Sequence, residues 1–135
     1  MELRIACLAD YAGLSIDRKL NIMGVFSNIF APNEPIIHPQ MYVVFQLDFE
    51  PAEAGRKAVK IVLQDADGRE LVSMGGEIEI GRPTPGQRST FNQIAQMNGT
   101  VFPKFGQYEI CILINGRTEA TIPLNAIRAE QPARP

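Results

Sequence analysis

Histidine, cysteine and tryptophan are scarce in this sequence. His38 is the only histidine, Cys7 and Cys111 are the only cysteines, and tryptophan is absent. One histidine and two distant cysteines match no zinc-ligand spacing. A cysteine–histidine dyad would need His38 beside a thiol, but both thiols lie among apolar residues and His38 lies between Ile37 and Pro39. We therefore expect no metal site, no cofactor and no enzymatic activity.

Clustered charge and long apolar runs are also missing. The 13 lysines and arginines are scattered and the formal net charge is −2, whereas nucleic-acid and membrane surfaces attract concentrated positive charge. No apolar run approaches the roughly 18 residues of a transmembrane helix. Glu2 and Arg4 interrupt the first apolar stretch, which does not resemble a secretory signal. We expect a cytoplasmic protein with free thiols and no nucleic-acid or membrane partner.

The sequence does contain a repeated alternation of apolar and polar residues. In 41–49 every second residue is apolar and falls on one face, which is typical of a half-buried strand. A chain of 135 residues with 45% hydrophobic residues is long enough for one packed core. About eight strands without helical periodicity predict an all-β fold, an antiparallel β-sandwich of the immunoglobulin-like Greek-key type. The other predicted strands are 3–9, 19–30, 58–65, 70–80, 89–97, 107–114 and 118–124.

Three strands carry more specific predictions. In the first, Leu3, Ile5 and Cys7 are expected to share the core-facing side. The stretch 19–30 is apolar enough for a central strand, with Gly24 as a bulge or a close-packing point. Pro123 suggests that the last strand is an edge strand, because proline donates no backbone hydrogen bond.

Glycine and proline mark the connections. The turn at 65–68 and the Asn-Gly pair at 115–116 predict tight hairpins, and 51–55 has room for one helical turn. The irregular stretches 31–40 and 81–89 are expected to carry the chain between sheets. We place a single domain at 1–127, followed by a flexible tail at 128–135.

Acidic residues near the 65–68 turn have two interpretations. Asp65 and Asp67, with Asp48 or Glu50, offer oxygen ligands for calcium at a sandwich rim. However, the EF-hand pattern is absent, and Asp-x-Asp-Gly is a common turn sequence. We expect the turn rather than a metal site.

Tyr108 and Cys111 are predicted to be structural. Tyr108 follows Gly106 at the start of a strand, where sandwich domains place a tyrosine that hydrogen-bonds back to the loop. Cys111 has isoleucine and leucine neighbours and no cationic neighbour, so it is expected to pack as a small apolar residue.

The polar faces of several strands hold apolar residues. Tyr42, Val44, Val62, Cys111 and Leu113 all lie opposite the predicted core faces. Exposed apolar residues grouped in this way usually mark an association surface. The alternative is that a loop, such as 31–40, covers them. If the patch is exposed, a homodimer is its simplest use.

Four stretches of the sequence carry a family resemblance: CLADYAGLSIDRKLNIMGVFSNIFAP at 7–32, HPQMYVVFQLDFEPAEAG at 38–55, VKIVLQDADGREL at 59–71 and FPKFGQYEICILINGRTEATIPL at 102–124. Through these stretches the sequence resembles a family of small, uncharacterised bacterial proteins known only as a domain of unknown function. The resemblance implies a single immunoglobulin-like sandwich and supplies no activity. Its most recognisable part places Asp10 and Tyr11 at one end of the sandwich, either as a capped turn or as a binding site.

Two functions remain open from the sequence. The leading hypothesis is a non-enzymatic interaction module that self-associates through a sheet face, using Tyr42, Val44, Val62 and Leu113. The alternative is a small-molecule or carbohydrate-binding sandwich that uses the loop end near Asp10, Tyr11 and His38.

Overall fold

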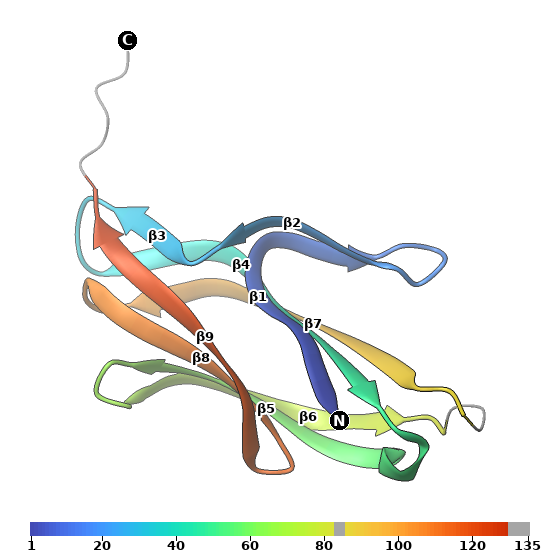
Figure 1. Cartoon of the computed structure of the whole chain (residues 1–135). Helices are drawn as coiled ribbons and strands as arrows, with labels where there is room; N and C mark the ends of the chain where they lie inside the picture. The colour runs from blue at the N-terminus through green and yellow to red at the C-terminus, as the bar shows by residue number, and fades with distance from the viewer. Residues whose placement is uncertain (83–85, 130–135) are drawn as a thin grey trace.

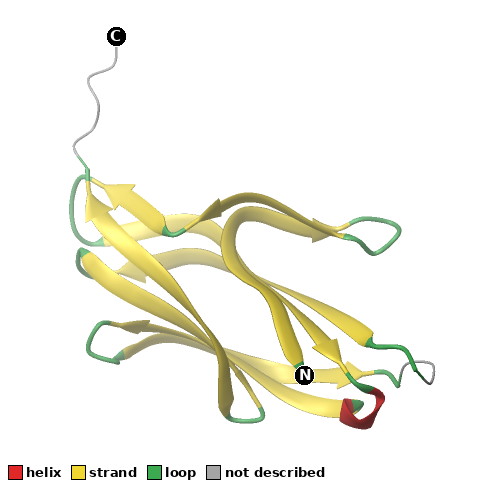
Figure 2. Ribbon diagram, in the orientation of Figure 1, coloured by secondary structure: helices red, strands yellow, loops and turns green. Residues whose placement is uncertain are grey.

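The structure is a computed structural model that describes residues 1–82 and 86–129, and it consists almost entirely of β-strands. The helical element among these residues is a single 3₁₀ turn, η1 (Pro51–Glu53), where the sequence predicted one helical turn (red in Figure 2). The strands are β1 (Glu2–Leu14), β2 (Leu20–Phe26), β3 (Asn28–Ala31), β4 (Ile36–Phe49), β5 (Gly55–Asp65), β6 (Glu70–Ile80), β7 (Ser89–Phe102), β8 (Gly106–Ile114) and β9 (Arg117–Arg128).

The strands form two stacked sheets (Figure 1). Sheet A has the order β2-β1-β4-β7, and sheet B has the order β3-β9-β8-β5-β6. In a constant-type immunoglobulin domain, strands A, B, E and D form one sheet and strands C, F and G form the other. Here β1, β4 and β7 occupy the places of A, B and E, while β5, β8 and β9 occupy those of C, F and G. The predicted antiparallel sandwich is confirmed, with the parallel pair β3–β9 as an addition.

The core lies between the sheets and is made by the faces that the alternation predicted. On β4, the apolar residues at alternate positions from Met41 to Phe49 have no exposed surface. Opposite them, Leu63 of β5 and Ile110 and Ile112 of β8 are equally buried. Burying one such side chain contributes about 1.5–3 kcal/mol, so these faces supply most of the driving force for folding.

The core-facing side of β1 differs from the prediction. We expected Leu3, Ile5 and Cys7 to face the core, but the β1 residues that pack there are Leu3, Ala6 and Leu8. The pairing with β4 shifts between Leu3 and Ile5, where β1 carries one extra residue. One extra residue moves all later side chains to the opposite face. Cys7 therefore lies on the outer side of sheet A, where it pairs with Val44.

The stretch 19–30 forms two strands in different sheets, not one central strand as predicted. β2 is the edge of sheet A, and after Ser27 the chain joins sheet B as β3. Both strands are apolar, so the alternation shows no break where the chain changes sheet. Residues 31–40 are also more regular than predicted, because β4 begins at the buried residue Ile36. The irregular connection is limited to 32–35.

Pro123 lies in a part of β9 that has a neighbour on one side only. β9 is an interior strand by sheet order, but β3 pairs with it only from Asn125 onward. Before that residue, β9 pairs only with β8. The proline therefore marks a local strand edge, as the sequence suggested, although the strand as a whole is not an edge strand.

The first two residues of the predicted tail, Arg128 and Ala129, belong to the folded part of the chain. β9 ends at Arg128, and the amide of Ala129 donates a hydrogen bond to the carbonyl of Ala31 (3.0 Å). The remainder of the predicted tail, 130–135, lies outside the described residues, as do residues 83–85 of the predicted loop 81–89.

Tyr108 connects the start of β8 to the loop before it. Its hydroxyl donates to the carbonyl of Lys104 (2.6 Å) and accepts from the amide of Lys104 (3.2 Å). The buried ring meets Phe102 edge to face, with 5.0 Å between ring centroids. Gly106 has φ 142°, a conformation that other residues rarely adopt. These contacts are those of a tyrosine corner, the role that the sequence predicted for Tyr108 and Gly106.

We expect Tyr108→Phe to lower the free energy of unfolding by about 1–2 kcal/mol, because both backbone groups of Lys104 lose a buried partner. Urea unfolding measures the loss. The matched control is Tyr42→Phe, since the Tyr42 hydroxyl accepts one hydrogen bond from the Gln40 side chain (2.8 Å) and holds no backbone group. Equal losses in the two variants would show that the corner contributes no more than an ordinary side-chain hydrogen bond.

Candidate interaction surface

The outer face of sheet A carries a second, smaller apolar cluster. Its buried members are Ala12 of β1 and Tyr42 and Val44 of β4. Beyond Ala9, which pairs with Tyr42, β1 leaves β4 and pairs only with β2. Figure 1 shows this bend in β1 and the hairpin that β1 and β2 form beyond it. The residues that pack around the cluster come from the hairpin and the sheet: Cys7, Leu20, Ile22 and Ile94.

The exposed patch predicted on the polar strand faces is therefore wrong for three of its residues. Tyr42, Val44 and Val62 are 9%, 0% and 7% exposed, and Leu113 is half-buried. On sheet A the cover is the β1–β2 hairpin and not the predicted loop 31–40. On sheet B, Val62 lies between Ser73 and Cys111 of the neighbouring strands. On sheet A, the apolar outer face that the sequence predicted therefore serves packing within the chain.

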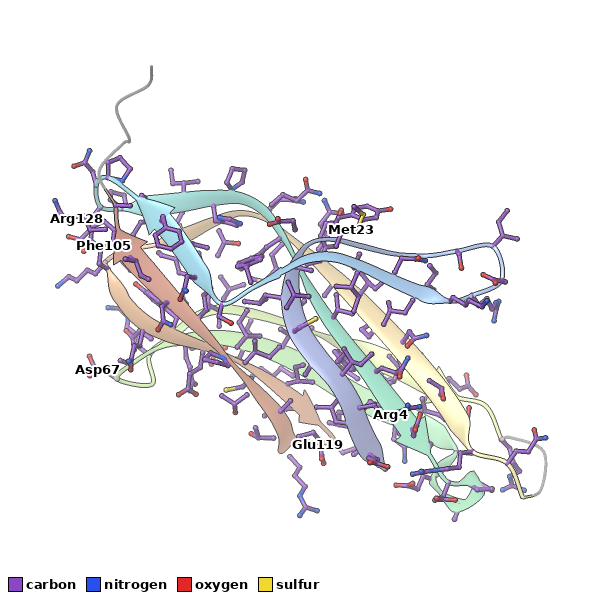
Figure 3. The ribbon with its side chains drawn as sticks, turned by 45° about the horizontal axis from the view of Figure 1, so that its top comes forward. Arg4, Met23, Asp67, Phe105, Glu119 and Arg128 are labelled. Carbon is purple, nitrogen blue, oxygen red and sulfur yellow. The ribbon has the colours of Figure 1, made fainter. Side chains whose placement is uncertain are left out.

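The β1–β2 hairpin has one covered face and one exposed face. Ala12 and Ile22 pair across the hairpin and belong to the second cluster. Their chain neighbours Tyr11 and Met23 pair with each other and are 52% and 65% exposed, and the ring of Tyr11 meets the cluster only at its margin, where it contacts Tyr42. Val25 lies two residues along β2 and is 63% exposed. We call Tyr11, Met23 and Val25 the hairpin patch; Figure 3 shows Met23 pointing away from the ribbon of β2.

The turn of the hairpin is closed by polar contacts. The Ser15 amide donates to the carbonyl of Lys19 and the Arg18 amide donates to the carbonyl of Ser15, each at 2.9 Å. Arg18 has φ 65°. The Ser15 hydroxyl donates to the Asp17 carboxylate, and Lys19 forms an ion pair with Asp17 at 3.1 Å. Hydrogen bonds from Ser15 and then Lys19 hold the pKa of Asp17 below its ordinary value.

The three residues of the predicted ligand site contact different neighbours. Asp10 lies so close to Gly24 that a β-carbon there would meet its carboxylate at 2.5 Å. The ring of Tyr11 contacts Tyr42 edge to face, with 5.6 Å between centroids. His38 lies at 5.6 Å from the ring of Phe26, at the far end of β2. Each of the three therefore has a packing contact of its own, with Gly24, Tyr42 and Phe26 respectively.

Two of the acidic residues considered for calcium, Asp65 and Asp48, accept hydrogen bonds within the fold. The Asp65 carboxylate accepts from the amides of Asp67 (3.0 Å) and Arg69 (2.8 Å), which closes the β5–β6 turn. Asp48 is buried on sheet A and accepts from the Thr90 hydroxyl at 2.8 Å. Within residues 1–82 and 86–129, no group of three or more His, Cys, Asp or Glu side chains is placed to hold a metal ion. No helix in the same residues is long and apolar enough to cross a bilayer.

The two thiols are free and lie on the outer faces of different sheets. Cys7 packs against the cluster beneath the hairpin, and Cys111 pairs with Val62 on sheet B. Burial raises the pKa of the Cys7 thiol, so less of it is thiolate at neutral pH than in an exposed cysteine.

We expect iodoacetamide at neutral pH to alkylate Cys7 at least about fivefold more slowly than Cys111, because the thiolate is the reacting form and the hairpin shields it. The variants Cys111→Ser and Cys7→Ser leave one thiol each, and mass spectrometry gives the two rates. Equal rates would show that the hairpin does not shield Cys7.

The solved structures that resemble this chain include two proteins of Pseudomonas. No curated protein matches the chain. An alkylpurine DNA glycosylase of Pseudomonas fluorescens, AlkC, solved bound to DNA containing an abasic-site analogue, matches with a TM-score of 0.51 and 11% identity. The match covers 95% of this chain and 30% of the glycosylase, so this chain corresponds to less than a third of that protein. An immunoglobulin-like protein of Pseudomonas aeruginosa matches with a TM-score of 0.42 and 12% identity over 94% of this chain and 98% of its own.

A family model covers nearly all of the sandwich. The model is described as a family of unknown function (DUF6941) and matches residues 4–127, from β1 to the penultimate residue of β9. The resemblance read from the sequence is thereby confirmed, and the chain belongs to this family of unknown function.

Proposed function

We propose that the chain is a non-enzymatic protein-interaction module that self-associates through the hairpin patch. The observation that carries this proposal is that the β1–β2 hairpin has apolar residues on both faces, and one of these faces is left in solvent. Five of the ten large apolar residues exposed in the described part of the chain lie in this one hairpin: Tyr11, Met23 and Val25 form the hairpin patch, and Leu14 and Ile16 lie near the turn. Apolar residues concentrated in this way usually mark an association surface.

The charges of the hairpin favour a second copy of the chain as the partner that binds the hairpin patch. The hairpin carries Asp10 and Asp17 together with Arg18 and Lys19, so its formal charge sums to zero. Two such surfaces related by a two-fold axis bring no excess of one sign together. The net charge of the whole chain, −2, also gives only weak repulsion between copies.

The proposal also includes the absence of enzymatic activity and a cytoplasmic location. The groups most able to act as nucleophile or base, Cys7, Cys111 and His38, lie in different surroundings: beneath the hairpin, on sheet B and against Phe26. A nucleophile needs its base within hydrogen-bond reach. Two free thiols suit a reducing compartment, so we place the protein in the cytoplasm.

Light scattering over a concentration range from about 1 µM to 1 mM tests the proposal. We expect the mass of the wild type to rise toward twice the monomer mass, and Met23→Lys to stay monomeric. Met23 is 65% exposed, so its replacement leaves the packing within the chain intact. The control is Thr121→Lys, which adds the same charge at an exposed position of β9.

Two results would overturn the proposal. If the wild type remains monomeric over the whole concentration range, the chain does not self-associate. If Met23→Lys associates as strongly as the wild type, the copies meet at another surface.

A further inference from the structure

The outer strands of the two sheets differ in how well their free edges are protected. Natural sheets protect edges with short strands, charged residues, prolines or kinks, because an unpaired backbone edge pairs readily with another chain. β3 has four residues, β2 is kinked by Gly24 at φ 71°, and β6 carries Glu70, Glu77 and Glu79. β7 has 14 residues and contains no charged residue and no proline, and its one glycine with positive φ, Gly99 (φ 59°), lies three residues before its end. β7 is therefore the unprotected edge of sheet A.

The side of the sandwich next to this edge is open and apolar. Two hollows of about 200 and 380 Å³ lie between β6 and β7, and Met74 lines both. The first is also lined by Ile78 and Ala95, and the second by Val72 and Met97. All five side chains pack against or belong to the main core, so the groove exposes the flank of that core.

In the middle of β7, one backbone carbonyl on the free edge accepts a weak hydrogen bond from a side chain of the same strand. The side-chain amide of Gln93 donates to the carbonyl of its neighbour Ile94 at 3.4 Å, the long end of hydrogen-bond geometry. A strand laid against β7 would replace this contact with backbone hydrogen bonds. In a constant-type immunoglobulin domain, strand D takes the corresponding place beside strand E.

We infer that the groove between β6 and β7 binds an extended segment of a partner protein, which adds to sheet A as a fifth strand beside β7. In this mode of recognition the backbone pairing supplies affinity, and alternate side chains fill pockets that supply specificity. The two hollows take the apolar side chains of the segment. This surface lies at the opposite edge of sheet A from the hairpin patch, so the inference does not depend on self-association.

The charges of the two strands that form the groove, β6 and β7, favour a basic segment over a second copy of the chain. The charged residues of β6 and β7 are three glutamates, with no lysine or arginine. Of these three glutamates, Glu77 alone has an ion pair within the described residues, with Arg56 at 3.7 Å. Two-fold pairing of β7 with β7 would bring two acidic β6 edges together, whereas lysines or arginines in the segment would be attracted.

The probe is a fluorescently labelled peptide of about ten residues that alternates valine with lysine. Fluorescence anisotropy with the full chain should show saturable binding. The matched acidic probe, with glutamate in place of lysine, should bind at least about tenfold more weakly because it meets the β6 glutamates.

Gln96→Pro locates the binding. In an antiparallel strand, residues alternate between pointing both backbone groups at one neighbour and at the other. Gln96 shares the direction of Ile94, whose carbonyl is free to accept a side chain, so its N–H points away from β4. Proline there removes one donor from the free edge, and we expect at least about tenfold weaker binding. Gln96→Ala keeps the N–H and should bind within about twofold of the wild type.

Three results would contradict the inference. If neither peptide binds, the groove is not a binding site for an extended segment. Equal binding of the basic peptide by Gln96→Pro and the wild type, with the variant folded by circular dichroism, places that binding elsewhere. A dimer that Gln96→Pro abolishes would assign the edge to a second copy, and Met23→Lys would leave such a dimer intact.

Discussion

Val44→Lys is expected to lower the free energy of unfolding by about 4 kcal/mol, measured by urea denaturation. Val44 has no exposed surface and lies in the cluster between sheet A and the hairpin. Lysine at this position loses the apolar contacts and buries an ammonium group without a partner. The hairpin can release the charge only by lifting off the sheet, so Cys7 should also be alkylated faster in the variant.

The control for this prediction is Thr121→Lys, at an exposed position of β9. A lysine there should change stability by no more than about 0.5 kcal/mol. If Val44→Lys keeps the wild-type stability and instead dissociates a dimer, then Val44 lies between copies, as the sequence alone suggested. That result would contradict the packing of the hairpin on sheet A.

Gly24→Val is expected to lower the free energy of unfolding by about 3 kcal/mol. Gly24 has φ 71°, which a β-branched residue adopts only with strain. A β-carbon at this position would also lie 2.5–3.1 Å from three side-chain atoms of Asp10. Strain and crowding together should detach β2 from β1, and urea unfolding should show the loss.

Gly68→Val separates the two causes of this loss. Gly68 has φ 81°, but a β-carbon there meets no atom within 4 Å. The Gly68 variant should therefore lose only the conformational part, about 1–2 kcal/mol. If both valine variants are destabilised equally, the approach of Asp10 to Gly24 has no energetic role.

Strand periodicity predicted the core well, because one face of a strand in a sandwich is buried whatever its neighbours are. The alternate residues of β4, β5 and β8 illustrate this, since all lie in the main core. Tyr108 was also recognisable, because a tyrosine corner depends on a partner only four residues away.

The predictions from the sequence were wrong where the structure depends on contacts between residues that are far apart in the chain. A single bulge after Leu3 turned Cys7 outward, and no local signal in 3–9 marks it. The change of sheet at Ser27 is invisible because both flanking strands are apolar. The cover over Val44 comes from residues more than twenty positions away in the chain, so alternation alone showed an apolar outer face without showing what covers it.

Only part of the two candidate surfaces could be predicted from the sequence. Tyr11 was singled out, but as part of a ligand site, and its partner Met23 was not, since pairing across the hairpin was unknown. The absence of charge in 89–102 was available as a signal, but an uncharged strand is informative only once it is known to be an edge.

Hydrogen–deuterium exchange at a low and a high protein concentration tests the central claim most directly, because it reports both whether copies meet and where. Self-association through the hairpin patch predicts slower exchange of amides in 20–26 at the high concentration, with unchanged exchange in β7 and β8. Exchange that is independent of concentration throughout the chain, or slowed only in β7, would contradict the account.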